Sequence, residues 1–224
     1  NRNGIVDAAE TAPRIADVTN DGIPDIVVGG DGVIALYTSD GASPVPAFTK
    51  SILHSVAGVT DIELVDLNND TYPDIVYGTE ASRSAGTLGY LTNNGTTPPV
   101  FTDTTLATAG PFQAIDTGDI DNNGFDDFIV TRGRRLGNVI GNGTFWYDND
   151  GSGFTRRAVF AESAMRLLYE SALMDINGDG DLDIVLALAH ELADSNTKNL
   201  TRAKAKEKRK KKKDERGGGG GGGG

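Results

Sequence analysis

The chain has 224 residues, of which 38% are hydrophobic and 7% aromatic, and it contains no cysteine. This is enough for a hydrophobic core, and it excludes disulfide bonds and thiolate metal sites. The longest apolar runs, of about six residues, are far shorter than the roughly 20 that a membrane-spanning helix needs, so we expect no membrane span. Because the chain begins with Asn1 rather than Met, we expect a processed or trimmed N-terminus.

The formal charge of −11 conceals two segments of opposite sign. Eleven of the 21 Lys and Arg residues, but only three of the 32 Asp and Glu residues, lie between Lys198 and Arg216. The first 197 residues therefore hold 10 basic and 29 acidic residues, a net charge of −19. A body this acidic attracts cations and repels nucleic acid and anionic membranes. We therefore expect no nucleic-acid partner.

Four similar segments follow one another along the chain. They are DVTNDGIPDIVVG from Asp17, DLNNDTYPDIVYG from Asp66, DIDNNGFDDFIVT from Asp119 and DINGDGDLDIVLA from Asp175, with starts 49, 53 and 56 residues apart. Phe-Thr pairs at Phe48, Phe101 and Phe154 keep a step of 53, and turns ending in Asp-Gly or Asn-Gly precede them at Gly41, Gly95 and Gly151. This regularity predicts a repeat protein with units of about 50 residues.

Each unit has the pattern of four short strands. An alternating run precedes the acidic segment, a β-branched run follows it, a third run carries aromatics, and a fourth begins at the Phe-Thr pair. Four antiparallel strands in about 50 residues is the size of one β-propeller blade. We expect an all-β propeller segment over residues 1–197, with blades at about 12–57, 58–109, 110–166 and, in part, 167–197. A β-sandwich with coincidental turns is the alternative.

The acidic segments are candidate cation-binding loops, here called loop 1 (17–25), loop 2 (66–74), loop 3 (119–127) and loop 4 (175–183). Numbered from the first Asp, each loop has oxygen-bearing side chains at positions 1, 3, 5 and 9, three of them carboxylates. Calcium takes six to eight oxygen ligands, including a backbone carbonyl, here expected from position 7. Positions 1, 3, 5, 7 and 9 are Asp17, Thr19, Asp21, Ile23 and Asp25; Asp66, Asn68, Asp70, Tyr72 and Asp74; Asp119, Asp121, Asn123, Phe125 and Asp127; Asp175, Asn177, Asp179, Asp181 and Asp183.

The sequence thus predicts up to four Ca²⁺ sites, in preference to Mg²⁺, which retains its waters. Glycine at position 6 permits a sharp bend in three loops, whereas Thr71 occupies this position in loop 2 and predicts a strained or weaker site. The loops are not EF-hands, because the closing carboxylate stands at position 9, directly before a strand. The alternative for any one loop is a metal-free turn capped by Asp and Asn side chains.

The motif D-x-[DN]-x-[DN]-G-x-x-D-[ILF]-[IV], repeated about every 50 residues, resembles the FG-GAP/VCBS repeats of integrin-α-type β-propellers and many secreted bacterial proteins. The resemblance covers roughly residues 12 to 190. It implies a calcium-stabilised propeller, extracellular or at the cell surface, with adhesion, carbohydrate binding or protein binding as its role. The chain departs from the pattern at Thr19 and Thr71, and it has about three and a half blades where the family's propellers usually have six to eight.

We therefore expect a non-enzymatic calcium-binding protein of adhesion or surface assembly, whose partners are a protein or carbohydrate ligand or copies of itself. Two alternatives are a structural subunit of an extracellular filament, favoured by the open edges of an incomplete ring, and an ancillary or carbohydrate-binding module of a larger secreted enzyme. No nucleophile elbow, phosphate loop or HExxH motif is present.

Other residues have two interpretations each. We expect structural roles for His54 and His190. Trp146 and Tyr147 are either core residues or a surface on which a sugar could stack. The cluster Arg132, Arg134 and Arg135 is either part of a solvated loop or a site for an anion. Of four N-x-[ST] sequons, those of Asn94 and Asn142 lie in NGT turns and are candidate glycosylation sites. Asn69 lies inside loop 2, where a glycan is not expected, and Asn199 lies in the C-terminal tail. The basic and polyglycine segment 198–224 predicts a disordered or artificial tail, with a charged helix or an arm for acidic partners as alternatives.

Overall fold

A computed structural model describes residues 10–30, 32–82, 85–132, 143–161 and 166–190. The chain divides into two compact units, residues 1–189 and 190–224, and the account below concerns the first. The predicted tail, residues 198–224, lies outside the described residues. No helix in the described part of the chain has the length and hydropathy needed to cross a lipid bilayer.

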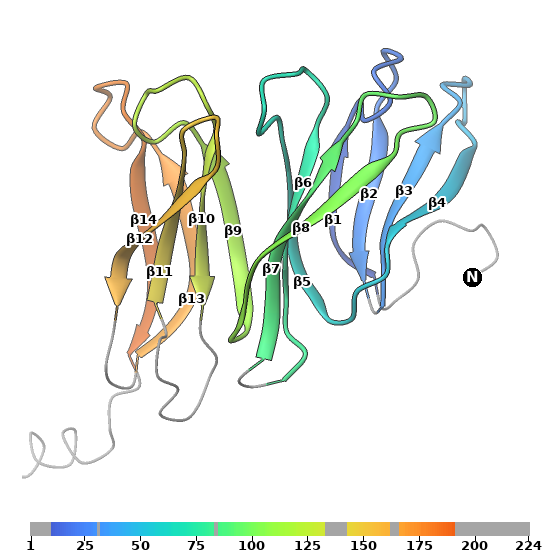
Figure 1. Cartoon of the computed structure of the whole chain (residues 1–224). Coiled ribbons are helices and arrows are strands. Elements are labelled where there is room, and N and C mark those ends of the chain that lie inside the picture. Colours follow the sequence, from blue (N-terminus) through green and yellow to red (C-terminus); the bar gives the residue numbers. More distant parts are fainter. Residues whose placement is uncertain (1–9, 31, 83–84, 133–142, 162–165, 191–224) are drawn as a thin grey trace, which may run out of the picture. The chain divides into compact units, whose positions relative to one another are not determined.

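The described residues form antiparallel sheets, three of which have four strands in simple sequential order (Figure 1). Sheet 1 contains β1 (Glu10–Ala16), β2 (Asp25–Gly30), β3 (Ile34–Ser39) and β4 (Phe48–His54). Sheet 2 contains β5 (Val59–Val65), β6 (Asp74–Thr79), β7 (Ala85–Asn93) and β8 (Phe101–Ala109). Sheet 3 contains β9 (Phe112–Gly118), β10 (Asp127–Arg132), β11 (Gly143–Asn149) and β12 (Phe154–Ala161). Sheet 4 pairs β13 (Arg166–Met174) with β14 (Asp183–His190).

These strands follow the sequence landmarks closely. The fourth strand of each complete sheet begins at the Phe of the Phe-Thr pair, and the second begins at the Asp in position 9 of a loop. The all-β prediction, with units of four antiparallel strands, is therefore confirmed for these three sheets. The β-branched second strands fit because they are buried: all six residues of β6 are buried.

Two hydrophobic cores lie where neighbouring sheets pack face to face. Because side chains alternate along a strand, β6 directs Ile75 and Tyr77 into a core shared with sheet 1 and Val76 into a core shared with sheet 3. Phe128 and Tyr147 stack with ring centroids 4.9 Å apart in the second of these cores. Each sheet face thus requires a neighbouring sheet to cover it, as in other repeat proteins.

Polar contacts join the first strands of successive sheets. Arg14 in β1 pairs with Asp61 in β5 at 3.0 Å and donates through Nε to Glu63 at 2.8 Å. The other carboxylate oxygen of Asp61 accepts from the amide of Ile115 in β9 at 2.9 Å. Such links fix the stagger between sheets, and hence the relative positions of the loops that follow these strands.

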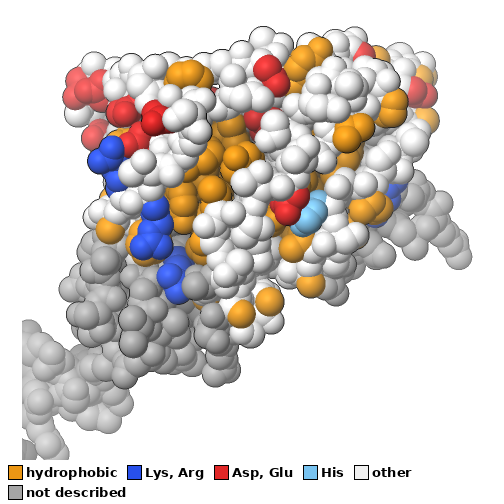
Figure 2. Space-filling model, in the orientation of Figure 1, with side chains coloured by type: hydrophobic (Ala, Val, Ile, Leu, Met, Phe, Trp, Pro, Cys, Tyr) orange, Lys and Arg blue, Asp and Glu red, His pale blue; other side chains and the backbone are white. Residues whose placement is uncertain are grey.

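All four loops lie at one end of the sheets, between the first and second strand of each sheet (Figure 1). In the view of Figure 2, acidic side chains are concentrated along this end of the molecule. The predicted negative charge is thus not spread evenly, and much of it belongs to the candidate cation-binding loops.

Candidate metal centre

The first aspartate of each loop organises the backbone of its own loop. In loop 1 the two carboxylate oxygens of Asp17 accept from the amides of Asp21, at 3.0 Å, and Gly22, at 2.7 Å. Asp66, Asp119 and Asp175 accept from the amides of positions 5 and 6 in the same way. These backbone hydrogen bonds lower the pKa of Asp175. Position 1 therefore holds each loop in a tight turn, and in loop 4 these bonds favour the charged carboxylate.

The side chain at position 5 also turns towards its own backbone. Asp21, Asp70, Asn123 and Asp179 each accept from the amide two residues later, at 2.8–2.9 Å. This Asx turn forms with Asp and with Asn alike, so it does not require a charge. One side-chain oxygen at position 5 is thus engaged within each loop.

Two positions in each loop have positive φ. At position 4 the values are 55°, 59° and 57° for Asn20, Asn69 and Asn122, and 79° for Gly178. At position 6, Gly22, Gly124 and Gly180 have φ of 86–94°, whereas Thr71 has φ of 74°. A β-branched residue is strained in this region of conformational space. The strain predicted for loop 2 is therefore present in its backbone.

In loops 1 to 3 the aspartate at position 9 is buried and joins its loop to the third strand of the sheet, whereas Asp183 in loop 4 is half-buried and accepts from the amide of Ile176 at 3.2 Å. Asp74 is fully buried; one carboxylate oxygen accepts from the amide of Leu67 at 3.1 Å and the other from the amide of Asn93 at 2.7 Å. Asp25 and Asp127 have the same pair of contacts. Burial raises the pKa of Asp74 to about 6 and also raises that of Asp127.

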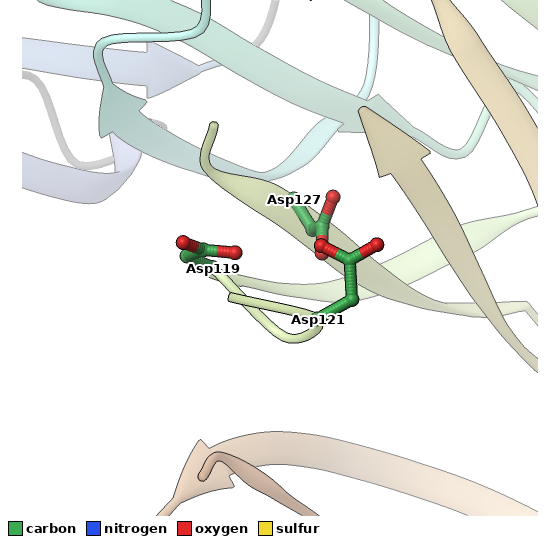
Figure 3. A group of neighbouring side chains, drawn as sticks. All are labelled: Asp119, Asp121 and Asp127. Carbon is green, nitrogen blue, oxygen red and sulfur yellow. The ribbon is translucent and has the colours of Figure 1, made fainter. Parts of the chain in front are cut away.

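Loop 3 brings three carboxylates together. Oxygens of Asp119, Asp121 and Asp127 lie within 4.8 Å of one another, and in the described part of the chain no other group of three acidic or histidine side chains does so. Figure 3 shows the Asp121 side chain, which projects from the loop, beside that of Asp127 at the start of β10. Three carboxylates at this separation repel one another unless a cation or a proton compensates them.

In loop 3 the carboxylate at position 3 lies close to those at positions 1 and 9. Loop 3 is the loop with an acidic residue there, Asp121; the others have Thr19, Asn68 and Asn177. In loop 1 the Thr19 hydroxyl oxygen is buried and has no hydrogen-bond partner. A buried hydroxyl without a partner is costly, and coordination of a cation would satisfy it. The oxygen-rich, nitrogen- and sulfur-free donor sets of loops 1 and 3 thus fit a hard cation such as Ca²⁺.

The side chains at position 7 pack against the turn between the third and fourth strands. A Cβ added to Gly151 would lie 2.4 Å from the ring of Phe125, and Gly95 and Gly41 approach Tyr72 and Ile23 in the same manner. In sheets 1 to 3, position 7 therefore anchors the loop to its sheet. In loop 4 position 7 is Asp181, whose carboxylate accepts from Asn122 at 2.7 Å.

A pair of asparagines and one further aspartate near the loops were not among the residues predicted from the sequence. Asn93 and Asn149, at the ends of the third strands, reach across to the preceding loop; Asn two residues before the turn Gly is a signal that could have identified them. Asp126, at position 8, is the aspartate: burial and the nearby carboxylates of Asp119 and Asp66 raise its pKa, so it lies within the electrostatic influence of loops 2 and 3.

The remaining candidates lie outside this centre. His54 packs against Tyr77, with the two rings tilted and their centroids 5.5 Å apart, and Tyr147 is buried in the core. Trp146 is half-buried beneath the guanidinium of Arg157. Arg132 is half-buried, with its Nε lacking a partner, and Asn94 lies in an exposed turn. The structure does not describe Arg134, Arg135, Asn142, Asn199 or the side chain of His190.

These features define a class of protein: an all-β repeat protein whose four-stranded antiparallel sheets have the form of blades and carry an acidic loop between their first and second strands. The model of the FG-GAP-like repeat matches residues 17–77 and 66–130, which together span just over half of the chain. The chain therefore belongs to the FG-GAP-like repeat family, whose members are typically extracellular or cell-surface proteins. Loops 1, 2 and 3 lie within the matched region and loop 4 lies beyond it. No curated protein sequence matches the chain.

Proposed function

We propose that this chain is a non-enzymatic, calcium-binding segment of a β-propeller that acts outside the cell or at its surface, in adhesion or surface assembly. The observation that carries the proposal is the convergence of Asp119, Asp121 and Asp127 in loop 3. The unpartnered Thr19 hydroxyl supports a second site in loop 1. Loops 2 and 4 share the backbone turn, with a neutral Asn at position 3, and would complete a set of four Ca²⁺ ions.

The extracellular role is supported by the family and by the chemistry of the loops. Each candidate site has three carboxylates and lies partly exposed, which would suit the weak binding of extracellular calcium modules, with dissociation constants of about 10⁻⁴–10⁻³ M. Calcium would then act as a permanent structural ligand where its concentration is high. A protein or carbohydrate ligand, or further copies of the chain, would bind to the surface that this stabilised scaffold presents.

Thermal unfolding of the full chain tests the proposal. Calcium at about 100 times its dissociation constant should add about 2.7 kcal/mol for each site that exists in the folded state only. For a protein of this size one such site raises the midpoint by about 5–10 °C. Magnesium serves as the matched control and should raise it less. Equal midpoints in calcium and in chelator, with no calcium retained after dialysis, would refute the proposal.

A further inference from the structure

Neighbouring loops are joined directly by asparagine side chains at position 4. Nδ2 of Asn69, in loop 2, donates to the carbonyl of Gly124, in loop 3, at 2.8 Å. Nδ2 of Asn122, in loop 3, donates to the carboxylate of Asp181, in loop 4, at 2.7 Å. The two bonds occupy equivalent places, each running from one loop to the next along the chain, so they are a repeated feature of the assembly of sheets.

In both bonds the acceptor lies in the segment of the next loop that would provide the backbone carbonyl ligand for calcium. The carbonyl of Gly124 and the amide of Phe125 belong to one peptide group; Asn69 holds the carbonyl and Asn123 accepts from the amide at 2.8 Å. The plane of this peptide group is therefore fixed from both sides. It leads directly into Phe125, whose own carbonyl is the expected ligand of loop 3. In loop 4 the bond holds Asp181, the residue at the same position 7.

Position 4 of loops 1 and 4 provides two comparisons with Asn69 and Asn122, because neither residue there makes such a bond to a described residue. Asn20 occupies position 4 of loop 1 with φ of 55°, close to the 59° and 57° of Asn69 and Asn122, yet its side chain makes no hydrogen bond to any described residue of loop 2. Position 4 of loop 4 is Gly178, with φ of 79°. The backbone conformation thus does not require the bond, and glycine is compatible with this position.

We propose that Asn69 and Asn122 are positioning residues that couple calcium binding in loops 2, 3 and 4. An ordered loop 2 holds Asn69 in place, and Asn69 then pre-orders the ligand-bearing segment of loop 3, which lowers the conformational entropy lost when loop 3 binds its ion. Asn122 does the same for loop 4. Because coupling between binding sites is reciprocal, occupancy of the later loop strengthens binding in the earlier one. This inference rests on the proposed calcium binding.

The test is a calcium titration of the full chain followed by amide NMR, with the amides of Gly22, Thr71, Gly124 and Gly180 reporting on the four loops separately. The variants are Asn69→Gly and Asn122→Gly, with Asn20→Gly as the matched control. We expect Asn69→Gly to weaken binding in loop 3, and Asn122→Gly in loop 4, by about tenfold, as for other groups that orient metal ligands. Asn20→Gly should leave loop 2 unchanged.

A second measurement does not depend on calcium. In chelator, Asn69→Gly should accelerate hydrogen exchange at the amide of Phe125, whereas Asn20→Gly should not alter exchange at Tyr72, its counterpart in loop 2. If each variant changed only its own loop, the coupling would be refuted while calcium binding stood. If the wild-type chain bound no calcium, the proposed function would fail and the coupling with it, although the exchange experiment would still decide whether Asn69 orders loop 3.

Discussion

The aspartates of one loop differ in what they do when no cation is bound. Asp127 is fully buried and accepts from two backbone amides, those of Ile120 at 3.0 Å and Asn149 at 2.7 Å. Asp121 is exposed, and its carboxylate accepts no hydrogen bond from a described residue. Stability without calcium and affinity for calcium can therefore be separated by substituting these two residues.

Asp127→Asn should destabilise the calcium-free protein by about 1–3 kcal/mol, because the amide can replace at most one of the two buried acceptors. Asp121→Asn should leave the calcium-free protein within about 0.5 kcal/mol of wild type, and both substitutions should weaken calcium binding. Urea unfolding in chelator measures the first effect and calorimetric titration the second. Equal stabilities of the two variants in chelator would contradict this division of roles.

The raised pKa of Asp74 predicts a pH dependence of the calcium-free protein. Burial raises this pKa from 3.8 to about 6, so between these values the folded state binds a proton more readily than the unfolded chain. The free energy of unfolding should therefore fall as the pH rises from about 4 to 6, by about 3 kcal/mol from this group, and level off above 6. Asp74→Asn should flatten the curve in this window. Urea unfolding at several pH values, in chelator, would measure it; an unaltered slope would exclude Asp74 as the source.

At the scale of elements, each loop is supported by the turn of its own sheet. Gly151, in the turn between β11 and β12, has φ of 77° and lies against the ring of Phe125. The turn glycines of sheets 1 and 2 have φ of 63° and 67° and make the equivalent contact. The Asp-Gly and Asn-Gly pairs of the sequence therefore serve two purposes: they reverse the chain, and they leave room for the side chain at position 7.

Gly151→Ala should destabilise the protein by about 1–3 kcal/mol. The new methyl group would overlap the Phe125 ring, and alanine is strained at positive φ. Gly153→Ala is the control, because Gly153 lies in the same turn with open space around it and an ordinary φ. Chemical denaturation of both variants in chelator decides the matter. A loss of stability as large in the control as in Gly151→Ala would show that the contact with Phe125 is unimportant.

At the scale of the molecule, hydrogen bonds connect the loop of one sheet to the closing aspartate of the next. Asn93 donates through Nδ2 to the carbonyl of Val18, in loop 1, at 3.1 Å, and through its amide to Asp74 at 2.7 Å. Asn149 repeats this arrangement with the carbonyl of Leu67, at 2.9 Å, and with Asp127. The packing of successive sheets and the geometry of the loops therefore depend on each other.

Asn149→Ala should destabilise the calcium-free protein by about 2–3 kcal/mol. It removes the bonds to the carbonyls of Leu67 and Asp126, at 2.9 and 3.0 Å, and leaves the Leu67 carbonyl buried without this partner. Ser39, the corresponding residue of sheet 1, makes a local side-chain contact with the amide of Gly41. Ser39→Ala should therefore cost about 1 kcal/mol or less. If both variants unfolded at the same denaturant concentration, the inter-sheet bond would have no net effect.

The sequence by itself determined the strands, their order within a sheet and the turn of each loop. These depend on residues close in the chain: alternation sets which face a strand buries, and the contacts of positions 1 and 5 span at most five residues. The need for positive φ at position 6, and the strain at Thr71, could be predicted for the same reason. The candidate ligands at positions 1, 3 and 9 of loop 3 were also among the predicted residues.

Only the tertiary structure decided which oxygens converge and which are engaged elsewhere. In loop 3 the carboxylates at positions 1, 3 and 9 converge, whereas the side-chain oxygen of Asn123 at position 5 accepts from the amide of Phe125. The roles of Asn69, Asn93, Asn122 and Asn149 depend on contacts between residues 55 to 82 positions apart. Spacing along the chain does not specify such contacts, because they form only when apolar faces of successive sheets pack and thereby set the distance from each loop to the next.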